Sequence, residues 1–246
     1  MHLLANIFVI LLLQVLSLYK KYITYYFTLP SSKKFFLVRA TVFNNSNILS
    51  VINYLKNNQN NRIRQYESDY SRLMSMILPY YYPYPTFYIS PEQHLGEAYH
   101  PDYTVGVPDE TGKNHPSLLC EIKKDLIDGS IPSWAKMLDQ MWDQCDAANS
   151  ENDGNGRMWT IAQRGLVICF FKFDLSSFGA GTEYVNFQPV IPNNWTIDTF
   201  RQHNIEITIE VINGVEEIRL ISWRFDNPSH QRHIHDLFNY ISSTRA

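Results

Sequence analysis

Apolar side chains recur at helical spacing in the segment that begins at Arg62. They follow the i, i+3, i+4 rule of an amphipathic helix and are Ile63, Tyr66, Tyr70, Leu73, Met74 and Ile77. The helix is expected to end at the tyrosine- and proline-rich residues 79–83. With about 100° of rotation per residue, Glu67 lies about 60° from the centre of the apolar stripe. The pattern therefore predicts that Glu67 stands at the border of the buried face.

Short runs of β-branched and aromatic residues, bounded by turn residues, predict strands in the rest of the chain. These runs lie at residues 86–89, 103–107, 117–123, 157–161, 165–173, 205–211 and 216–222. The last two runs are joined at Asn213-Gly214, which favours a two-residue hairpin turn.

Two further helices are predicted from their spacing. One begins near Ile131, and its apolar face consists of Trp134, Met137, Leu138, Met141, Trp142 and Cys145. The other lies near the end of the chain, where Ile234, Leu237, Phe238 and Ile241 share one face. The order helix, three strands, helix, then strands predicts an α/β (α+β) fold: a mixed β-sheet flanked by helices, with a C-terminal β-hairpin and helix.

The first 61 residues have a different character. Residues 3–18 are nearly all apolar and are followed by Lys20 and Lys21, but the run is shorter than the roughly 20 residues of a spanning helix. It predicts a buried or appended helix, a membrane anchor or uncleaved signal, or an extension outside the working domain. Eight of the 18 residues from Asn44 to Asn61 are Asn, which favours a linker around one short helix near residues 48–55.

These patterns divide the chain into an N-terminal apolar segment and linker, residues 1–61, and a functional domain, residues 62–246. The domain would consist of a motif core, residues 62–174, and a C-terminal hairpin and helix, residues 175–246. Because residues 3–18 are apolar, they are also the predicted site of any membrane contact.

Composition excludes several classes of protein. The chain has 246 residues, 45% of them hydrophobic, and a formal net charge of −3, values that exclude a disordered, collagen-like or polybasic chain. They allow a nuclease, whose basic groups can gather in one cleft of a nearly neutral protein. Cys120, Cys145 and Cys169 are too dispersed for a disulfide framework or a zinc knuckle. Buried thiols indicate a reducing, intracellular location, cytoplasmic or nuclear, with a membrane-anchored protein as the alternative.

Two carboxylates and one ammonium group are expected to converge at one end of the sheet. Because strand side chains alternate between faces, Glu121 and Lys123 share a face. Asp102 stands at the start of the neighbouring predicted strand. A pair of carboxylates can hold Mg²⁺ or Mn²⁺, which acidifies a bound water, and a lysine can orient or deprotonate that water. The pattern predicts hydrolysis of phosphodiester bonds in DNA or RNA.

The sequence Pro101-Asp102 followed by Glu121-x-Lys123 resembles the signature of the PD-(D/E)xK nuclease superfamily, the restriction-endonuclease-like fold. The resemblance covers about residues 62–174. It implies a helix–three strands–helix–strand core, with the aspartate opening the second strand and the E-x-K on the third. It also implies that Asp102 and Glu121 are metal ligands and that Lys123 positions the water.

The resemblance extends to two neighbouring helices. Members often carry a glutamate on the first helix, which implies that Glu67 is an auxiliary metal ligand. Some members carry a Q-x-x-x-Y pattern on the helix after the lysine, which implies a catalytic role for Gln140. Here the chain departs from the pattern, because Gln144 occupies the position of the tyrosine.

The sequence is also compatible with several alternatives. Asp109 also follows a proline and precedes Glu121, but turn residues come after it, so Asp102 is preferred. The carboxylates and the lysine would have no catalytic role if they lay on an exposed edge strand. The domain would then be a catalytically inactive nuclease-fold module that binds nucleic acid or a protein partner. A third alternative, which depends on residues 3–18, is a membrane-tethered or secreted binding domain.

Overall fold

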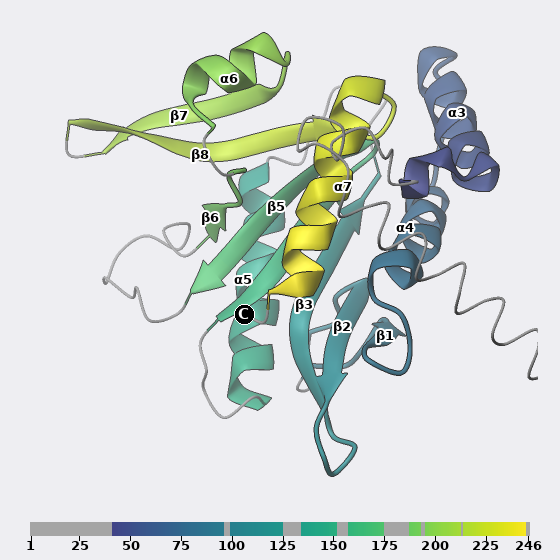
Figure 1. Cartoon of the computed structure of the whole chain (residues 1–246), viewed down its shortest axis with the longest axis vertical. Helices are drawn as coiled ribbons and strands as arrows, with labels where there is room; N and C mark the ends of the chain where they lie inside the picture. The colour runs from purple at the N-terminus through teal and green to yellow at the C-terminus, as the bar shows by residue number, and fades with distance from the viewer. Residues whose placement is uncertain are drawn as a thin grey trace, which may run out of the picture. The chain divides into compact units, whose positions relative to one another are not determined.

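The structure is a computed structural model that describes residues 41–95, 99–124, 134–151, 157–174, 187–192, 195–212 and 214–244 (Figure 1). The apolar segment 3–18 lies outside the described residues. One compact unit spans Val42–Ala246 and contains the whole predicted functional domain. No helix within the described ranges is long and apolar enough to cross a membrane.

A mixed sheet of eight strands runs through the described part of this unit (Figure 1). The order is β1-β2-β3-β4-β5-β8-β7, with β6 paired to β5 beside this path. Strands β3 and β4 are parallel, and the other pairs are antiparallel. The strands are β1 (Tyr88–Pro91), β2 (Tyr103–Pro108), β3 (Asn114–Lys123), β4 (Arg157–Arg164), β5 (Val167–Asp174), β6 (Phe187–Pro189), β7 (Glu206–Ile212) and β8 (Val215–Arg224).

Helices cover both faces of the sheet. Helix α5 (Trp134–Glu151) packs on β3 and β4, whereas α4 (Glu67–Tyr81) packs on the other face of β3. Helix α7 (Pro228–Ser243) contacts β8 and α4. The other helical elements of the described residues are η1 (Val42–Asn44), α3 (Ser46–Asn60) and α6 (Ile197–Gln202). The predicted mixed sheet flanked by helices is confirmed, whereas β6 and α6 were not predicted.

Strand β3 supplies both sides of the core. Leu118, Cys120 and Ile122 belong to the apolar cluster shared with α4 and α7, whereas Leu119 belongs to the cluster shared with α5. Because successive side chains alternate, Glu121 falls on the α5 face, where β3 is buried. The third core strand therefore carries a carboxylate on a face whose neighbouring residue, Leu119, belongs to the apolar core.

Helix α3 differs from the linker that the asparagines suggested. It runs for 15 residues, and Ile48, Val51, Ile52 and Leu55 on one side of it are buried. Asn45 caps its start, with the side chain accepting a hydrogen bond from the Asn47 backbone N–H at 2.9 Å. Burial of this stripe in the cluster that includes α4 outweighs the poor helix propensity of Asn. The compact unit begins at Val42 and so includes α3.

Helix α4 begins five residues later than the periodicity suggested. Arg62 has a positive φ of 55°, and Tyr66 has an extended backbone that caps the helix, so Glu67 is the first helical residue. As a result, Ile63 and Tyr66 lie outside the apolar stripe and are 51% and 59% exposed.

Candidate active site

The pairing of β2 with β3 brings the predicted acidic residues to one corner of the sheet. The strands are antiparallel and Tyr103 pairs with Cys120, so the start of β2 lies beside the end of β3. The backbone N–H of Ile122 donates a hydrogen bond to the Oδ2 atom of Asp102 at 2.6 Å. Asp102 is thereby fixed against the backbone segment that carries Glu121 and Lys123.

Glu121 is the buried centre of this group, at 1% exposure. The Nζ of Lys123 donates a hydrogen bond to its Oε1 atom. The Nε2 of Gln144 donates to its Oε2 atom at 2.8 Å. A carboxylate removed from water requires such partners, because an unpaired buried charge is costly. Glu121 is therefore held in one position by β3 itself and by α5.

The structure brings Gln144, and not the predicted Gln140, to Glu121. Gln144 is 1% exposed, whereas Gln140 is exposed one turn earlier on α5. The apolar stripe of α5 includes Met141 and Cys145, and at about 100° per residue Gln144 lies roughly 40° closer to its centre than Gln140 does. This stripe is readable in the sequence and was the signal that could have identified Gln144.

Glu67 lies at the start of α4 and is half-buried. Its charge raises the pKa of both Asp102 and Lys123, so it is within electrostatic range of the site. The hydroxyl groups of Ser71 and Tyr103 are hydrogen-bonded at 2.9 Å, which holds the beginning of α4 against the beginning of β2.

The charges in this corner shift the pKa values of their neighbours. Burial, followed by the repulsion of Glu121 and then Glu67, raises the pKa of Asp102 to about 7, although the Ile122 N–H and Lys123 oppose the shift. Burial also tends to lower the pKa of Lys123, but Glu121 and the other carboxylates outweigh this effect and raise it. Asp102 therefore keeps a proton to a higher pH than an ordinary carboxyl group does, and Lys123 holds its proton more tightly than an ordinary lysine. Lys123 thus suits the stabilisation of negative charge better than the removal of a proton.

The ligand chemistry of the corner fits a hard divalent cation. Asp102 and Glu121 offer carboxylate oxygens, and the Oε1 atom of Gln144 is buried without a hydrogen-bond partner among the described residues. Mg²⁺ accepts such oxygens and keeps several waters. Among the described residues, however, no group of three or more His, Cys, Asp or Glu side chains is arranged to hold an ion. A cation held by Asp102 and Glu121 would complete its shell with water or substrate oxygens.

Arg164 is a basic neighbour that the sequence did not single out. The parallel register pairs Lys123 with Arg164, so both side chains lie on the α5 face of the sheet. The guanidinium lies 5.7 Å from the centre of the Trp134 ring. The whole of α5 lies between β3 and β4 in the sequence. Arg164 is therefore brought beside Lys123 by the β3–β4 register and not by sequence proximity.

The rival residue Asp109 lies at the opposite end of β2. It is exposed in the β2–β3 turn and accepts hydrogen bonds from the backbone N–H groups of Thr111 and Lys113 at 2.8 and 2.9 Å. Its contacts with His115 and Thr111 hold its pKa below the usual range. Asp109 therefore stabilises the turn.

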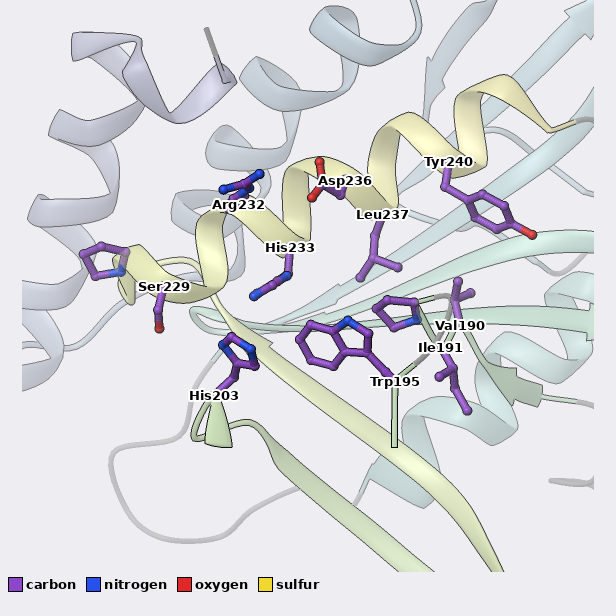
Figure 2. A pocket seen from close by; sticks show the side chains of 12 residues that line it. Val190, Ile191, Trp195, His203, Ser229, Arg232, His233, Asp236, Leu237 and Tyr240 are labelled. Carbon is purple, nitrogen blue, oxygen red and sulfur yellow. The ribbon is translucent and has the colours of Figure 1, made fainter. Parts of the chain in front are cut away.

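A pocket of about 610 Å³ lies elsewhere, between α7 and the segment after β6 (Figure 2). Trp195 stacks on His203 with ring centres 5.0 Å apart, and His233 meets the same indole at 4.7 Å. Neither Asp102 nor Glu121 lines this pocket. The other two histidines of α7 have structural partners, since His230 binds the Arg224 backbone and His235 binds the Tyr81 hydroxyl.

Comparison of the chain with protein-family models, curated proteins and solved structures yields no match.

Proposed function

We propose that this protein is a metal-dependent nuclease that hydrolyses phosphodiester bonds in DNA or RNA. The convergence of Asp102, Glu121 and Lys123 where β2 starts and β3 ends carries the proposal. The element order α4, β1, β2, β3, α5, β4 supports a restriction-endonuclease-like core and a place in the PD-(D/E)xK superfamily. Carboxylates that repel one another in the core cost stability, and such arrangements are typical of functional sites.

Each residue has a distinct role in the proposed reaction. Asp102 and Glu121 hold Mg²⁺ or Mn²⁺, with Glu67 contributing through its charge or as an auxiliary ligand. The ion would polarise a phosphoryl oxygen and acidify a bound water. Lys123 positions the attacking water and offsets the charge that develops on the phosphate. Gln144 keeps the Glu121 carboxylate oriented.

A second candidate is a non-catalytic module that keeps this fold and binds nucleic acid or a protein. It is favoured by one observation: both oxygens of Glu121 already have protein partners, Lys123 and Gln144. A cation would have to share or displace one of them. A cleavage assay separates the two candidates.

The three described cysteines are free and buried, which supports an intracellular location, cytoplasmic or nuclear. Membrane contact through residues 3–18 is the alternative, and it concerns residues outside the described part of the chain.

The decisive experiment is cleavage of labelled single-stranded DNA, duplex DNA and RNA by the purified chain. We expect cleavage with Mg²⁺ or Mn²⁺ and none with EDTA. Lys123→Ala and Asp102→Asn should reduce the rate by 100-fold or more, in the range expected for groups that stabilise developing charge. Asp109→Asn is the matched control and should leave the rate unchanged. Metal-independent cleavage, or cleavage that survives both site variants, would contradict the proposal.

A further inference from the structure

The connection between α3 and α4, residues 62–66, presents an unusual set of side chains. Its backbone is anchored by Gln65, which is buried and donates a hydrogen bond from Nε2 to the Leu55 carbonyl at 2.7 Å. The other four residues, Arg62, Ile63, Arg64 and Tyr66, are exposed. A firmly held segment therefore exposes two cations and two large apolar groups side by side.

Arg62 occupies a backbone conformation that arginine does not favour. Its φ is 55°, and the N–H of Ile63 bonds to the Asn58 carbonyl at 2.9 Å, which closes the end of α3. Gly, or less often Asn, is the usual residue at this point of a helix end. Asn60 and Asn61 stand immediately before it, yet an arginine takes the left-handed position. A side chain held on a strained backbone is a reason to look for a function of that side chain.

Arg64 and Tyr66 form a pair. The guanidinium carbon of Arg64 lies 5.5 Å from the centre of the Tyr66 ring, which is a cation–π distance. Tyr66 itself is 59% exposed. Neither Arg62 nor Arg64 has an ion pair with a described carboxylate. The pair thus offers a cation and an accessible aromatic surface together.

The connection leads directly into the candidate site. Tyr66 caps α4, and the next residue, Glu67, acts electrostatically on Asp102 and Lys123. The beginning of α4 is tied to the beginning of β2 by the hydrogen bond between the Ser71 and Tyr103 hydroxyl groups. A protein of net charge −3 with acidic residues in its site repels a polyanion unless cations gather locally. Arg62 and Arg64 supply two cations on the segment that immediately precedes Glu67 in the chain.

We propose that residues 62–66 bind single-stranded nucleic acid beside the acidic site. This inference rests on the proposed function, because the bound strand is the substrate of that site. Arg62 and Arg64 contact phosphates, and Tyr66 stacks on an unpaired base. A duplex does not offer the face of its bases to a surface tyrosine, whereas a single strand does. Single-stranded DNA and RNA both offer phosphates and base faces, so both can bind in this way. The test therefore measures them separately.

The test measures binding without cleavage. Fluorescence anisotropy of labelled strands about 16 nucleotides long is recorded in EDTA over a series of salt concentrations, with single-stranded DNA, single-stranded RNA and duplex DNA. The variants are Arg62→Gly, Arg64→Gln, Tyr66→Ala and Tyr66→Phe. Arg201→Gln, an exposed arginine on α6, is the control.

We expect each arginine substitution to reduce the slope of log K against log salt by about 0.7 for a single strand. Arg62→Gly should melt no lower than wild type, because glycine relieves the strained backbone. Tyr66→Ala should weaken single-strand binding by about tenfold, within the range for one stacked base, and Tyr66→Phe should restore it. The affinity for duplex DNA should not respond to Tyr66→Ala. Arg201→Gln should change the affinity for neither single-stranded nor duplex nucleic acid.

An unchanged salt slope in Arg62→Gly and Arg64→Gln, or failure to bind either single strand, overturns the inference. So does equal weakening of duplex and single strand by Tyr66→Ala. If the variants lose binding as expected but the wild type never cleaves, the inference stands and the nuclease function fails. If the wild type cleaves and the variants bind normally, the nuclease function stands and the inference fails.

Discussion

The carboxylate of Asp102 accepts a hydrogen bond from the backbone N–H of Ile122, at 2.6 Å. Ile122 stands between Glu121 and Lys123, and its own side chain is buried on the opposite face of β3. The bond therefore links the first residue of the site to the backbone that carries the other two. Because a main-chain group donates it, the link requires the pairing of β2 with β3 and not a particular side chain at position 122.

Divalent cations should stabilise the wild-type protein. Asp102, Glu121 and Glu67 repel one another when no cation is present, and a bound ion relieves the repulsion and stabilises the folded state by mass action. We expect millimolar Mg²⁺ or Mn²⁺ to raise the melting temperature of the wild type, measured by differential scanning fluorimetry.

The rise should be smaller in Asp102→Asn, which removes one charge and keeps an oxygen to accept the Ile122 hydrogen bond. Asp109→Asn is the control, because that carboxylate lies in the distant β2–β3 turn, and it should respond like the wild type. Equal shifts in wild type and Asp102→Asn would show that the ion binds elsewhere.

Stability of the metal-free protein should fall as the pH rises from about 4 to about 7. The pKa of Asp102 is raised to about 7 by burial and by Glu121, so the folded state keeps a proton that the unfolded state has already lost. The stabilisation is complete below pH 4 and is lost as the pH passes the folded-state pKa. One pKa unit corresponds to about 1.4 kcal/mol, and partial exposure of Asp102 reduces the expected loss to about 2 kcal/mol.

Urea denaturation at several pH values measures this dependence. The side chain introduced by Asp102→Asn does not titrate. As the pH rises, the unfolding free energy of the wild type should therefore fall relative to that of the variant. A difference that stays constant from pH 4 to pH 8 would mean that Asp102 has an ordinary pKa.

The two glutamines of α5 should have different importance. Gln144→Ala removes the donor to Oε2 of the buried Glu121 and should destabilise the protein by about 1–3 kcal/mol, the cost of an unsatisfied buried group. Gln140→Ala changes an exposed residue and should have an effect within about 0.5 kcal/mol. Chemical denaturation compares them, and similar losses in both variants would refute a special role for Gln144.

The same pair tests the site itself. If Gln144 orients Glu121 for metal binding, Gln144→Ala should weaken Mg²⁺ binding and slow cleavage at saturating nucleic acid, at a temperature where the variant is fully folded. Gln140→Ala should behave as the wild type. Normal metal binding by folded Gln144→Ala would leave Gln144 with a purely structural role.

Glu67→Gln should make the metal-free protein more stable at pH 7. Glu67 raises the pKa of Asp102, so removal of its charge should lower that pKa and reduce the repulsion within the site. The unfolding free energy of Glu67→Gln should therefore stop falling at a lower pH than that of the wild type. Denaturation curves at pH 5 and pH 8 measure the change; curves identical to those of wild type would place Glu67 outside the electrostatic range of Asp102.

Local pattern determined a large part of this protein. The alternation of side chains along a strand is enough to put Glu121 and Lys123 on one face, because each residue of an extended chain turns its side chain by half a revolution. The order of helices and strands likewise predicted a mixed sheet with helices packed on it, which the structure has. These features depend on neighbours in sequence, and so the sequence contains them directly.

Tertiary contacts decided the rest. The rotation of α5 about its axis selects Gln144 over Gln140, the parallel register of β3 and β4 places Arg164 beside Lys123, and packing with α4 makes α3 a full helix in spite of its asparagines. Each of these outcomes depends on which surfaces meet across long stretches of chain. Periodicity shows that a surface is apolar, but burial against a particular partner is what fixes its register and rotation.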